Sequence, residues 1–374
     1  MRLAILLALA CACGRDPAPR SQLDEIDLAL VRAAHFLQTR QSADGALRSR
    51  TYAAFKDGYT LTPLATLALR MCPRSPAIDA AYARGVAFVA TIVDGDRVRD
   101  ATEVRYPLYA YAIGALVLGA PDNTRYRAAH DQLLGALREL QLVERNGWLP
   151  DDPSYGGWGY ATRPPRRPSD EPLEANLSAT VFAIGALVLG GTAGDDPALV
   201  AARGFVERCH NADGGFVFSP ALADGNKAGP APGGGFHSYG SMTADGLRAL
   251  LRLGRGLDPA ATRWLDAHFD AARNPGEFVV EAEIRRDSSY FYWTWTAAHA
   301  TRHLQRRAWA EALATELLRR QRLDGSWSNP ASEMREDDPI VATSFAIAAL
   351  VLARSVLAGE PKSHAYAVRT DRGP

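Results

Sequence analysis

The chain has 374 residues, is 47% hydrophobic by composition, and carries 42 Lys+Arg against 42 Asp+Glu. This balance excludes a strongly basic protein, and the arginines are scattered along the chain, so we expect no nucleic-acid partner. The length allows an extensive apolar core.

The N-terminus has the pattern of an export signal. A short apolar core follows Arg2 and leads into two cysteines. Ala-Leu-Ala before Cys11 resembles a bacterial lipobox, and Cys13 is the second candidate for lipidation. We expect residues 1–13 to be the signal and 14–22 a flexible tether. The mature protein would then lie in the bacterial cell envelope, anchored by lipid on the periplasmic or outer-surface face. The alternative is an ordinary secretory signal.

Hydrophobic segments recur along the rest of the chain. Ala-Ile-Gly-Ala-Leu-Val-Leu-Gly occurs at 112–119 and 183–190, and a near copy occupies 346–352. Turns containing glycine mark six units, and their first residues are Asp44, Asp94, Asn146, Asp213, Asn274 and Asp324. Internal repeats of this length indicate an array of supersecondary units.

Each unit is predicted to be a helical hairpin. The outer helices have apolar residues at three- and four-residue spacing and are expected at 23–40, 76–92, 125–142, 197–209, 259–272 and 307–320. The inner helices are apolar nearly all round and are expected at 59–71, 106–118, 175–189, 239–253, 288–304 and 339–352. Several starts place a capping side chain before a proline, as in Asp338-Pro339.

A helix that is apolar on all sides must be surrounded by protein. Six hairpins of this kind predict an all-α (α/α)6 toroid, with inner and outer helix rings. An open superhelix is the alternative. We expect one domain over residues 23–358 and a disordered tail at 359–374. Cys72 and Cys209 are expected to be buried, reduced thiols.

The turns resemble those of a known superfamily. Gln321-Arg-Leu-Asp324-Gly325-Ser-Trp327 matches the Gln-x-x-Asp-Gly-x-Trp repeat of squalene cyclases and protein prenyltransferase β subunits. Related copies begin at Gln41, His210 and Tyr155. The resemblance covers nearly the whole mature chain and implies an α/α toroid whose central cavity takes isoprenoid chains in the enzymes. In that superfamily the Gln, Gly and Trp of the motif tie helices together, so these residues are expected to be structural.

The catalytic motifs of the superfamily are altered in this chain. Class II terpene cyclases use Asp-x-Asp-Asp to protonate an alkene, whereas this chain has Arg335-Glu336-Asp337-Asp338. Arg335 would keep neighbouring carboxylates ionised, and Asp338 is better explained as a helix cap. Asp337 is the remaining candidate proton donor.

No metal or soluble cofactor is expected. The Asp-x-Cys pair that holds zinc in protein prenyltransferases does not occur in the sequence. His299 and His303 have a metal-binding spacing, but Ala300 stands where a zincin has its glutamate, and no third ligand is evident.

Aromatic residues cluster where inner helices begin. They would line the mouth of the ring and suit an apolar chain or a sugar, or else fill and close the barrel. The candidate ligand-binding residues are Trp158, Tyr160, Phe236, Tyr239, Tyr290, Trp293 and Trp295.

Three functions remain open from the sequence. The favoured one is an exported, membrane-tethered toroid that binds an apolar or glycan ligand, or a partner protein, without intact catalytic motifs. The second is a terpene-cyclase-like enzyme that uses Asp337 as the acid. The third is a carbohydrate-active toroid, which would need two carboxylates facing each other across a cleft, drawn from Asp151, Asp152, Glu281 and Glu283.

Overall fold

A computed structural model describes residues 21–168 and 173–361, which contain thirteen α-helices. The outer helices are α1 (Gln22–Arg40), α3 (Pro76–Ala90), α5 (Arg127–Glu139), α7 (Pro197–Arg208), α9 (Pro259–His268) and α12 (Arg307–Arg320). The inner helices are α2 (Leu61–Met71), α4 (Pro107–Leu118), α6 (Leu177–Leu189), α8 (Gly240–Arg252), α11 (Tyr290–Leu304) and α13 (Pro339–Leu357), and the short α10 (Glu283–Ser288) precedes α11. The proposed signal with Cys11 and Cys13, and the tail after residue 361, lie outside the described residues.

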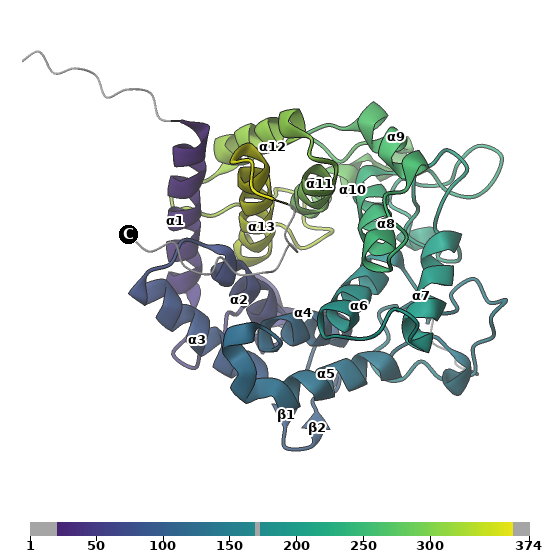
Figure 1. Cartoon of the computed structure of the whole chain (residues 1–374), viewed down its shortest axis with the longest axis horizontal. Coiled ribbons are helices and arrows are strands. Elements are labelled where there is room, and N and C mark those ends of the chain that lie inside the picture. Colours follow the sequence, from purple (N-terminus) through teal and green to yellow (C-terminus); the bar gives the residue numbers. More distant parts are fainter. Residues whose placement is uncertain (1–20, 169–172, 362–374) are drawn as a thin grey trace, which may run out of the picture.

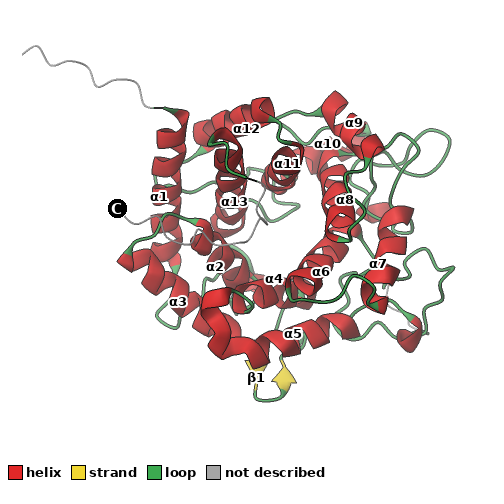
Figure 2. Cartoon of the chain, in the orientation of Figure 1, coloured by secondary structure: helices red, strands yellow, loops and turns green. Residues whose placement is uncertain are grey.

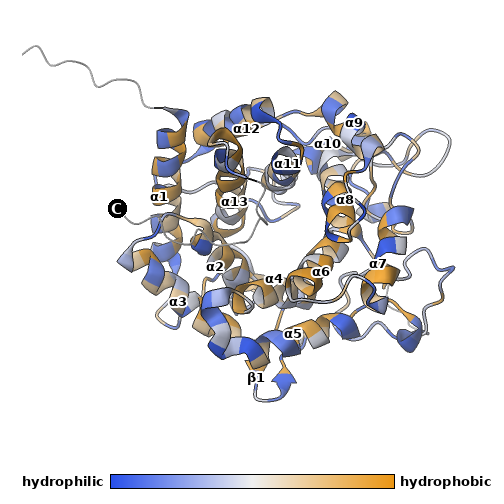
Figure 3. Cartoon of the chain, viewed as in Figure 1, coloured by the Kyte–Doolittle hydropathy of each residue, from blue (hydrophilic) through white to orange (hydrophobic). Residues whose placement is uncertain are grey.

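The helices form two concentric rings (Figures 1 and 2). The last inner helix, α13, packs against the first, α2, so the inner ring is closed. The inner helices α4, α6 and α13 are strongly hydrophobic, whereas α8 and α11 carry more polar residues, and the outer helices mix polar and apolar residues (Figure 3). The predicted (α/α)6 toroid is confirmed, and the open superhelix is not adopted.

The helix boundaries differ from the predicted ones in a few places. Helix α13 continues to Leu357, beyond the repeated segment. Helix α9 ends at His268 because Phe269 has ψ 127° and leaves the helical path. Ser289 separates α10 from α11. Asp338 caps α13 as predicted, since its Oδ1 accepts a hydrogen bond from the Ile340 N–H at 2.8 Å.

Glutamine side chains connect neighbouring outer helices. The Gln41 amide Nε2 donates to the carbonyl oxygens of Gly45 in its own turn and Ala81 in α3, both at 2.9 Å. Gln141 makes the same pair of bonds to Gly156 and to Ala198 in α7, at 2.9 and 2.8 Å. We call this arrangement the glutamine clamp. It satisfies the carbonyl of the turn, adds a second hydrogen bond to a helix carbonyl, and sets the position of one outer helix relative to the next.

The turn beside each clamp is held by two further contacts. Gly45 has φ +91°, and a Cβ there would lie 2.3 Å from the Arg84 carbonyl oxygen, so only glycine fits. The residue two positions on donates its N–H to a threonine of the inner helix, as in Leu47 to Thr62 Oγ1 at 2.9 Å. The same bond recurs from Trp158 to Thr180, Phe216 to Thr243 and Trp327 to Thr343.

The last clamp closes the ring. Gln321 Nε2 donates to the Gly325 carbonyl at 3.0 Å and to the Ala29 carbonyl of α1 at 2.9 Å. Its Oε1 accepts from Arg32. Beside it, Arg354 of α13 makes a two-bond ion pair with Asp27 of α1, at 2.6 and 2.8 Å.

One of the four aligned turns departs from the clamp. His210 stands where the other turns have glutamine, and its Nε2 is buried with no hydrogen-bond partner in the described chain. Gly214 still packs against the Ala260 carbonyl of α9. A hollow between His210 and Asp258 lies at this position on the outer ring.

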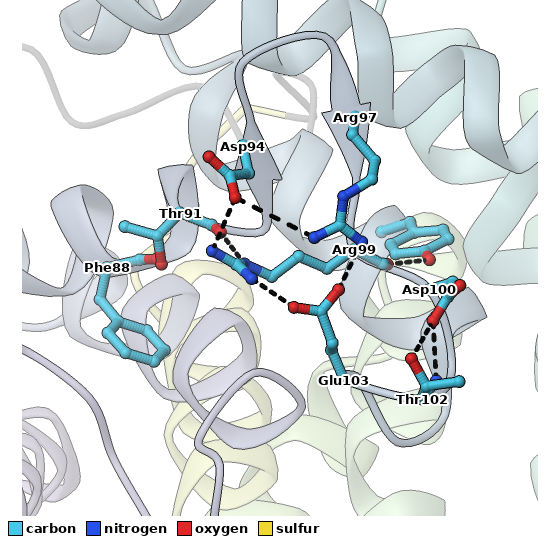
Figure 4. Close-up of polar contacts among 9 residues, drawn as sticks. Phe88, Thr91, Asp94, Arg97, Arg99, Asp100, Thr102 and Glu103 are labelled. Atoms are coloured by element: carbon cyan, nitrogen blue, oxygen red, sulfur yellow. Dashed lines mark hydrogen bonds and ion pairs between the residues drawn. The ribbon is translucent and has the colours of Figure 1, made fainter.

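A short hairpin, β1 (Val93–Asp94) with β2 (Arg97–Val98), precedes α4. Glu103 pairs with Arg97 at 2.5 Å and with Arg99, and Asp94 lies 3.4 Å from Arg99 (Figure 4). Tyr111 of α4 donates its hydroxyl to the Arg99 carbonyl. These contacts fix the segment that leads into α4.

The two cysteines are free and buried, as predicted. Burial raises the pKa of the Cys72 thiol to about 12 and also raises that of Cys209. Among the described residues, one helix, α13, is long and apolar enough to cross a membrane. Its apolar window is 83% buried, as expected of a core helix in the ring.

We predict that Gln321→Ala lowers the free energy of unfolding by about 2–3 kcal/mol, because two buried carbonyls each lose a hydrogen bond. Gln22→Ala is the matched control. It also removes bonds between α1 and α12, but these are exposed to water, and the expected loss is below about 0.5 kcal/mol. Urea unfolding measures both. Equal losses would show that the clamp does not hold the ring closed.

Candidate functional site

A cavity lies inside the inner ring. It encloses about 480 Å³ free of protein atoms, counting the solvent at its opening, but water-sized spheres can be centred in only about 20 Å³ of it. Its lining is mostly apolar and comes from all six inner helices: Leu64, Leu67, Ala68, Met71, Ile113, Leu116, Phe182, Arg248, Arg252, Trp295, Ser344, Phe345 and Ala348. Because Met71 and Arg252 end their helices, the cavity extends toward the C-terminal ends of the inner ring.

Trp295 is the central aromatic side chain of this wall. Its ring lies 5.2 Å from that of Phe182, 5.3 Å from Phe345 and 5.5 Å from Tyr292, measured between centroids. His299 lies one turn further along α11, with its ring 5.4 Å from that of Trp295. Burial and the nearby arginines hold the pKa of His299 well below its usual value, so this imidazole is neutral.

A buried ion pair enters the cavity from α8. Arg248 Nη2 donates to Asp245 Oδ1 at 2.8 Å, and the two side chains are 2% and 0% exposed. The guanidinium also lies over the Trp295 ring, 4.2 Å from its centroid. Its Nε and Nη1 are buried without a hydrogen-bond partner in the described residues. Arg248 thus brings unsatisfied donors to an apolar cavity.

A chain of hydroxyl groups crosses the lumen above this pair. Tyr109 of α4 lies 3.1 Å from Ser178 Oγ of α6, which lies 2.8 Å from the Tyr292 hydroxyl of α11. Tyr292 in turn donates to Asp245 Oδ2 at 2.5 Å. Burial raises the pKa of the Asp245 carboxyl, while Arg248 and Tyr292 oppose the rise. We call this chain the lumen bar, since it joins four inner helices above the cavity.

Asp245, Arg248 and Tyr292 were not among the site residues predicted from the sequence. Two of them could have been found from their charge. Asp245 and Arg248 lie three residues apart in a helix that was predicted to be buried, where charged residues are unusual. Arg252 follows on the same side, and a Cβ at Gly185 of α6 would lie 2.4 Å from its Nη1. The glycine therefore makes room for this guanidinium.

The predicted aromatic residues occupy different layers of the ring. Trp295 lines the cavity. Trp158 and Trp293 are fully buried between the rings, and their Nε1 atoms donate to the carbonyls of Leu137 and Asp270. Tyr290 lies in the same layer, with its hydroxyl bonded to the Ala271 carbonyl and Arg320 over its ring. Tyr239 is fully buried against Phe278, and Phe236 is half-buried in the loop before α8.

Tyr160 lies at the opposite end of the lumen, where the inner helices begin. It is 45% exposed and is part of an aromatic series that also contains Tyr106, Phe55 and Tyr52, with neighbouring centroids 5.8 to 6.5 Å apart. Tyr106 has φ +53°, a conformation that is rare outside glycine and that recurs at functional sites. We call these four residues the aromatic rim.

Asp337 adjoins this rim and does not line the cavity. The Tyr52 hydroxyl donates to its carboxylate, 2.6 Å from both oxygens. Arg335, which also has a positive φ of 61°, lies over the Tyr52 ring at 4.5 Å.

Glu336 is buried and accepts hydrogen bonds from the N–H groups of Phe291 and Tyr292, both at 2.8 Å. Burial raises the pKa of Glu336 to about 7, although these donors favour the carboxylate. Glu336 therefore caps α11. In the described residues no group of three or more His, Cys, Asp or Glu side chains could hold a metal ion.

No family model matches the chain, and no curated protein sequence matches it either. Solved structures do resemble it. A variant of the type II terpene cyclase MstE from Scytonema, in complex with geranylgeranyl dihydroxybenzoate, superposes with TM-score 0.55 at 13% identity, covering 90% of this chain and 99% of that one. The apo cyclase gives TM-score 0.53 at 14% identity, covering 91% and 100%.

A glycosidase variant in complex with glucose gives TM-score 0.52 at 14% identity, covering 92% of this chain and 100% of that one. At this identity the likeness shows the fold. The chain has the α/α toroid found in type II terpene cyclases and in glycosidases, as expected from the resemblance of its turns.

We predict that Arg248→Met lowers the free energy of unfolding by about 3 kcal/mol, because Asp245 is left as an unpaired buried charge. Without Arg248 the folded pKa of Asp245 rises further above its unfolded value, so folding takes up a proton and the loss is smaller at acidic than at alkaline pH. The double variant Asp245→Asn, Arg248→Met should recover more than half of the stability. Additive losses in urea unfolding would contradict the pairing.

Proposed function

We propose that this protein is a binding toroid whose lumen holds a narrow apolar chain that carries an anionic group. The observation behind this proposal is that Arg248, whose buried Nε and Nη1 donors have no hydrogen-bond partner in the described residues, lines a mostly apolar cavity. A carboxylate or phosphate on the ligand would satisfy these donors, and Arg252 lies in the same wall.

The cavity walls suit such a chain. Leucine, isoleucine and methionine side chains surround the narrow space, and the flexible Met71 stands at its end. Burying an alkyl or prenyl chain against them contributes about 25 cal/mol per Å² of apolar surface. The MstE cyclase structure with a geranylgeranyl ligand supports an isoprenoid-like chain as the occupant.

Binding fits the cavity better than alkene protonation does. Asp337 lies at the rim beside Tyr52 and Arg335, away from the cavity lining. Asp245 is closer, but both of its carboxylate oxygens already accept hydrogen bonds from Arg248 and Tyr292. The terpene-cyclase alternative would need one of these carboxyls to become protonated next to an arginine.

The carbohydrate-active alternative has less support. Asp152 is bound to Arg167 at 2.9 Å, and Glu283 is bound to Arg286 at 2.7 Å, so each carboxylate has a local structural partner. The exposed Tyr106 and Tyr160 remain suited to a glycan or to a partner protein at the rim.

Ligand binding is tested with geranylgeranoic acid and geranylgeraniol, using native mass spectrometry and tryptophan fluorescence. The acid should bind, and Ala348→Phe, which fills the cavity, should abolish binding. Val200→Phe on the exposed surface of α7 is the control and should bind normally. Arg252→Met should weaken the acid about tenfold, the loss of roughly one charge-assisted hydrogen bond, and leave the alcohol unchanged. Binding that survives Ala348→Phe would place the ligand elsewhere.

We also propose that the chain is exported and anchored to the membrane by lipid on Cys11 or Cys13. The support is the sequence pattern described above. In a bacterial host supplied with an alkyne fatty acid, the full chain should take up label and fractionate with membranes. One of the variants Cys11→Ser and Cys13→Ser should lose both properties. If the label is absent, or survives in both single variants, this assignment is wrong.

A further inference from the structure

Lys227 is an unusual residue in this chain. The 42 basic residues include only three lysines, Lys56, Lys227 and Lys362, so arginine carries almost every positive charge. Lys56 is exposed, and Lys362 lies outside the described residues. Lys227 is half-buried where the inner helices begin, at the opposite end of the lumen from the apolar cavity. Arginine cannot serve as an amine nucleophile, whereas lysine can.

The Lys227 ammonium has no ion-pair or hydrogen-bond partner in the described residues, and lies 4.5 Å from the centroid of the Phe218 ring. Phe218 in turn adjoins Tyr160 of the aromatic rim, with centroids 6.4 Å apart. The two carboxylates that act on its charge are already engaged. Glu336 caps α11, and Asp245 is bound by Arg248 and Tyr292.

Hydrogen bonds order the loop around Lys227. The buried Asn226 side chain accepts from the N–H of Phe218 at 2.8 Å and donates to the carbonyls of Ser219 and Leu222 at 2.8 and 2.9 Å. On the other side of Lys227, the Ala228 carbonyl accepts from the N–H of Val279 at 3.0 Å. The backbone on both sides of Lys227 is therefore held close to the Phe218 ring.

The charges around Lys227 act in both directions. Burial is the largest effect, and together with Arg285 of α10 it lowers the pKa of Lys227 to about 8. Glu336, before α13, and Asp245 of α8 oppose this shift. At pH 7.5 about a quarter of such an amine is neutral, against about 0.1% of an ordinary lysine. A neutral amine beside apolar rings is the activated form of a lysine nucleophile.

We propose that Lys227 is an imine-forming amine that captures a small aromatic aldehyde or ketone beside the aromatic rim. The Nζ lone pair attacks the carbonyl carbon, the carbonyl π electrons move to oxygen, and proton transfer from nitrogen to oxygen gives a carbinolamine. Loss of water then forms the C=N bond, so that amine and carbonyl yield an imine and water with no oxidant or reductant. The exposed Tyr160 ring would pack on the aromatic group. This site does not depend on what occupies the apolar cavity.

The full chain is incubated with benzaldehyde and cyanoborohydride, which fixes the imine as a secondary amine, and each lysine peptide is quantified by mass spectrometry. Lys56 is the internal control. At pH 7.5 Lys227 should be modified at least tenfold faster than Lys56, with a rate that reaches half its maximum near pH 8.

Two variants separate reactivity from folding. Lys227→Arg should leave Lys56 labelling unchanged and give no adduct in its own peptide. Phe218→Leu keeps an apolar side chain but removes the ring, and should bring the labelling of Lys227 closer to that of Lys56. Labelling of Lys227 at the rate of Lys56, or with a midpoint near that of an ordinary lysine, would overturn the proposal.

Discussion

The ring depends on the glutamine clamp. A single amide group with two N–H donors reaches a carbonyl in its own turn and a carbonyl on the next outer helix, at 2.8 to 3.0 Å in the clamps of Gln41, Gln141 and Gln321. The turn carbonyl would otherwise be buried without a partner, whereas the helix carbonyl gains a second hydrogen bond beside the one within its own helix. Each clamp also fixes the turn that begins the following inner helix. The positions of the outer helices and of the inner helices are therefore coupled. The Gln321 clamp, which bonds to α1, joins the last repeat to the first.

Much of the fold could be predicted because this interaction leaves a sequence signature. Glutamine, glycine and tryptophan at fixed spacing identify the turn, and period and polarity identify the two helices. The Gln141 clamp was harder to find, since Gln141 and Gly156 are separated by an inserted loop that contains the Asn146-Gly147 turn. The motif is recognised by the fixed spacing between its glutamine and its glycine. An insertion changes that spacing, so the sequence alone does not show that Gln141 and Gly156 belong to one clamp.

The cavity residues were predicted less well, for a geometric reason. Trp293 and Trp295 were grouped together, yet two positions on an α-helix differ by about 200°, so they face opposite ways. The lumen face of α11 instead carries Tyr292, Trp295 and His299, at helical spacing. The sequence does not show how α11 is rotated about its own axis in the ring. The aromatic cluster alone therefore could not show which of its residues line the cavity and which lie between the two rings.

The lumen bar gives the two ends of the ring different chemistry. Below it, aliphatic side chains and two arginines line a narrow cavity, while above it the exposed Tyr160 and the half-buried Lys227 both adjoin the buried Phe218 ring. The ion pair of Asp245 and Arg248 stands at the boundary, although a buried pair of charges contributes little to stability compared with apolar side chains of similar size. A ring that needed only to fold could have filled this position with leucine. The charged pair, the hydroxyl groups and Lys227 argue that the inner ring is built around ligands as well as around its own core.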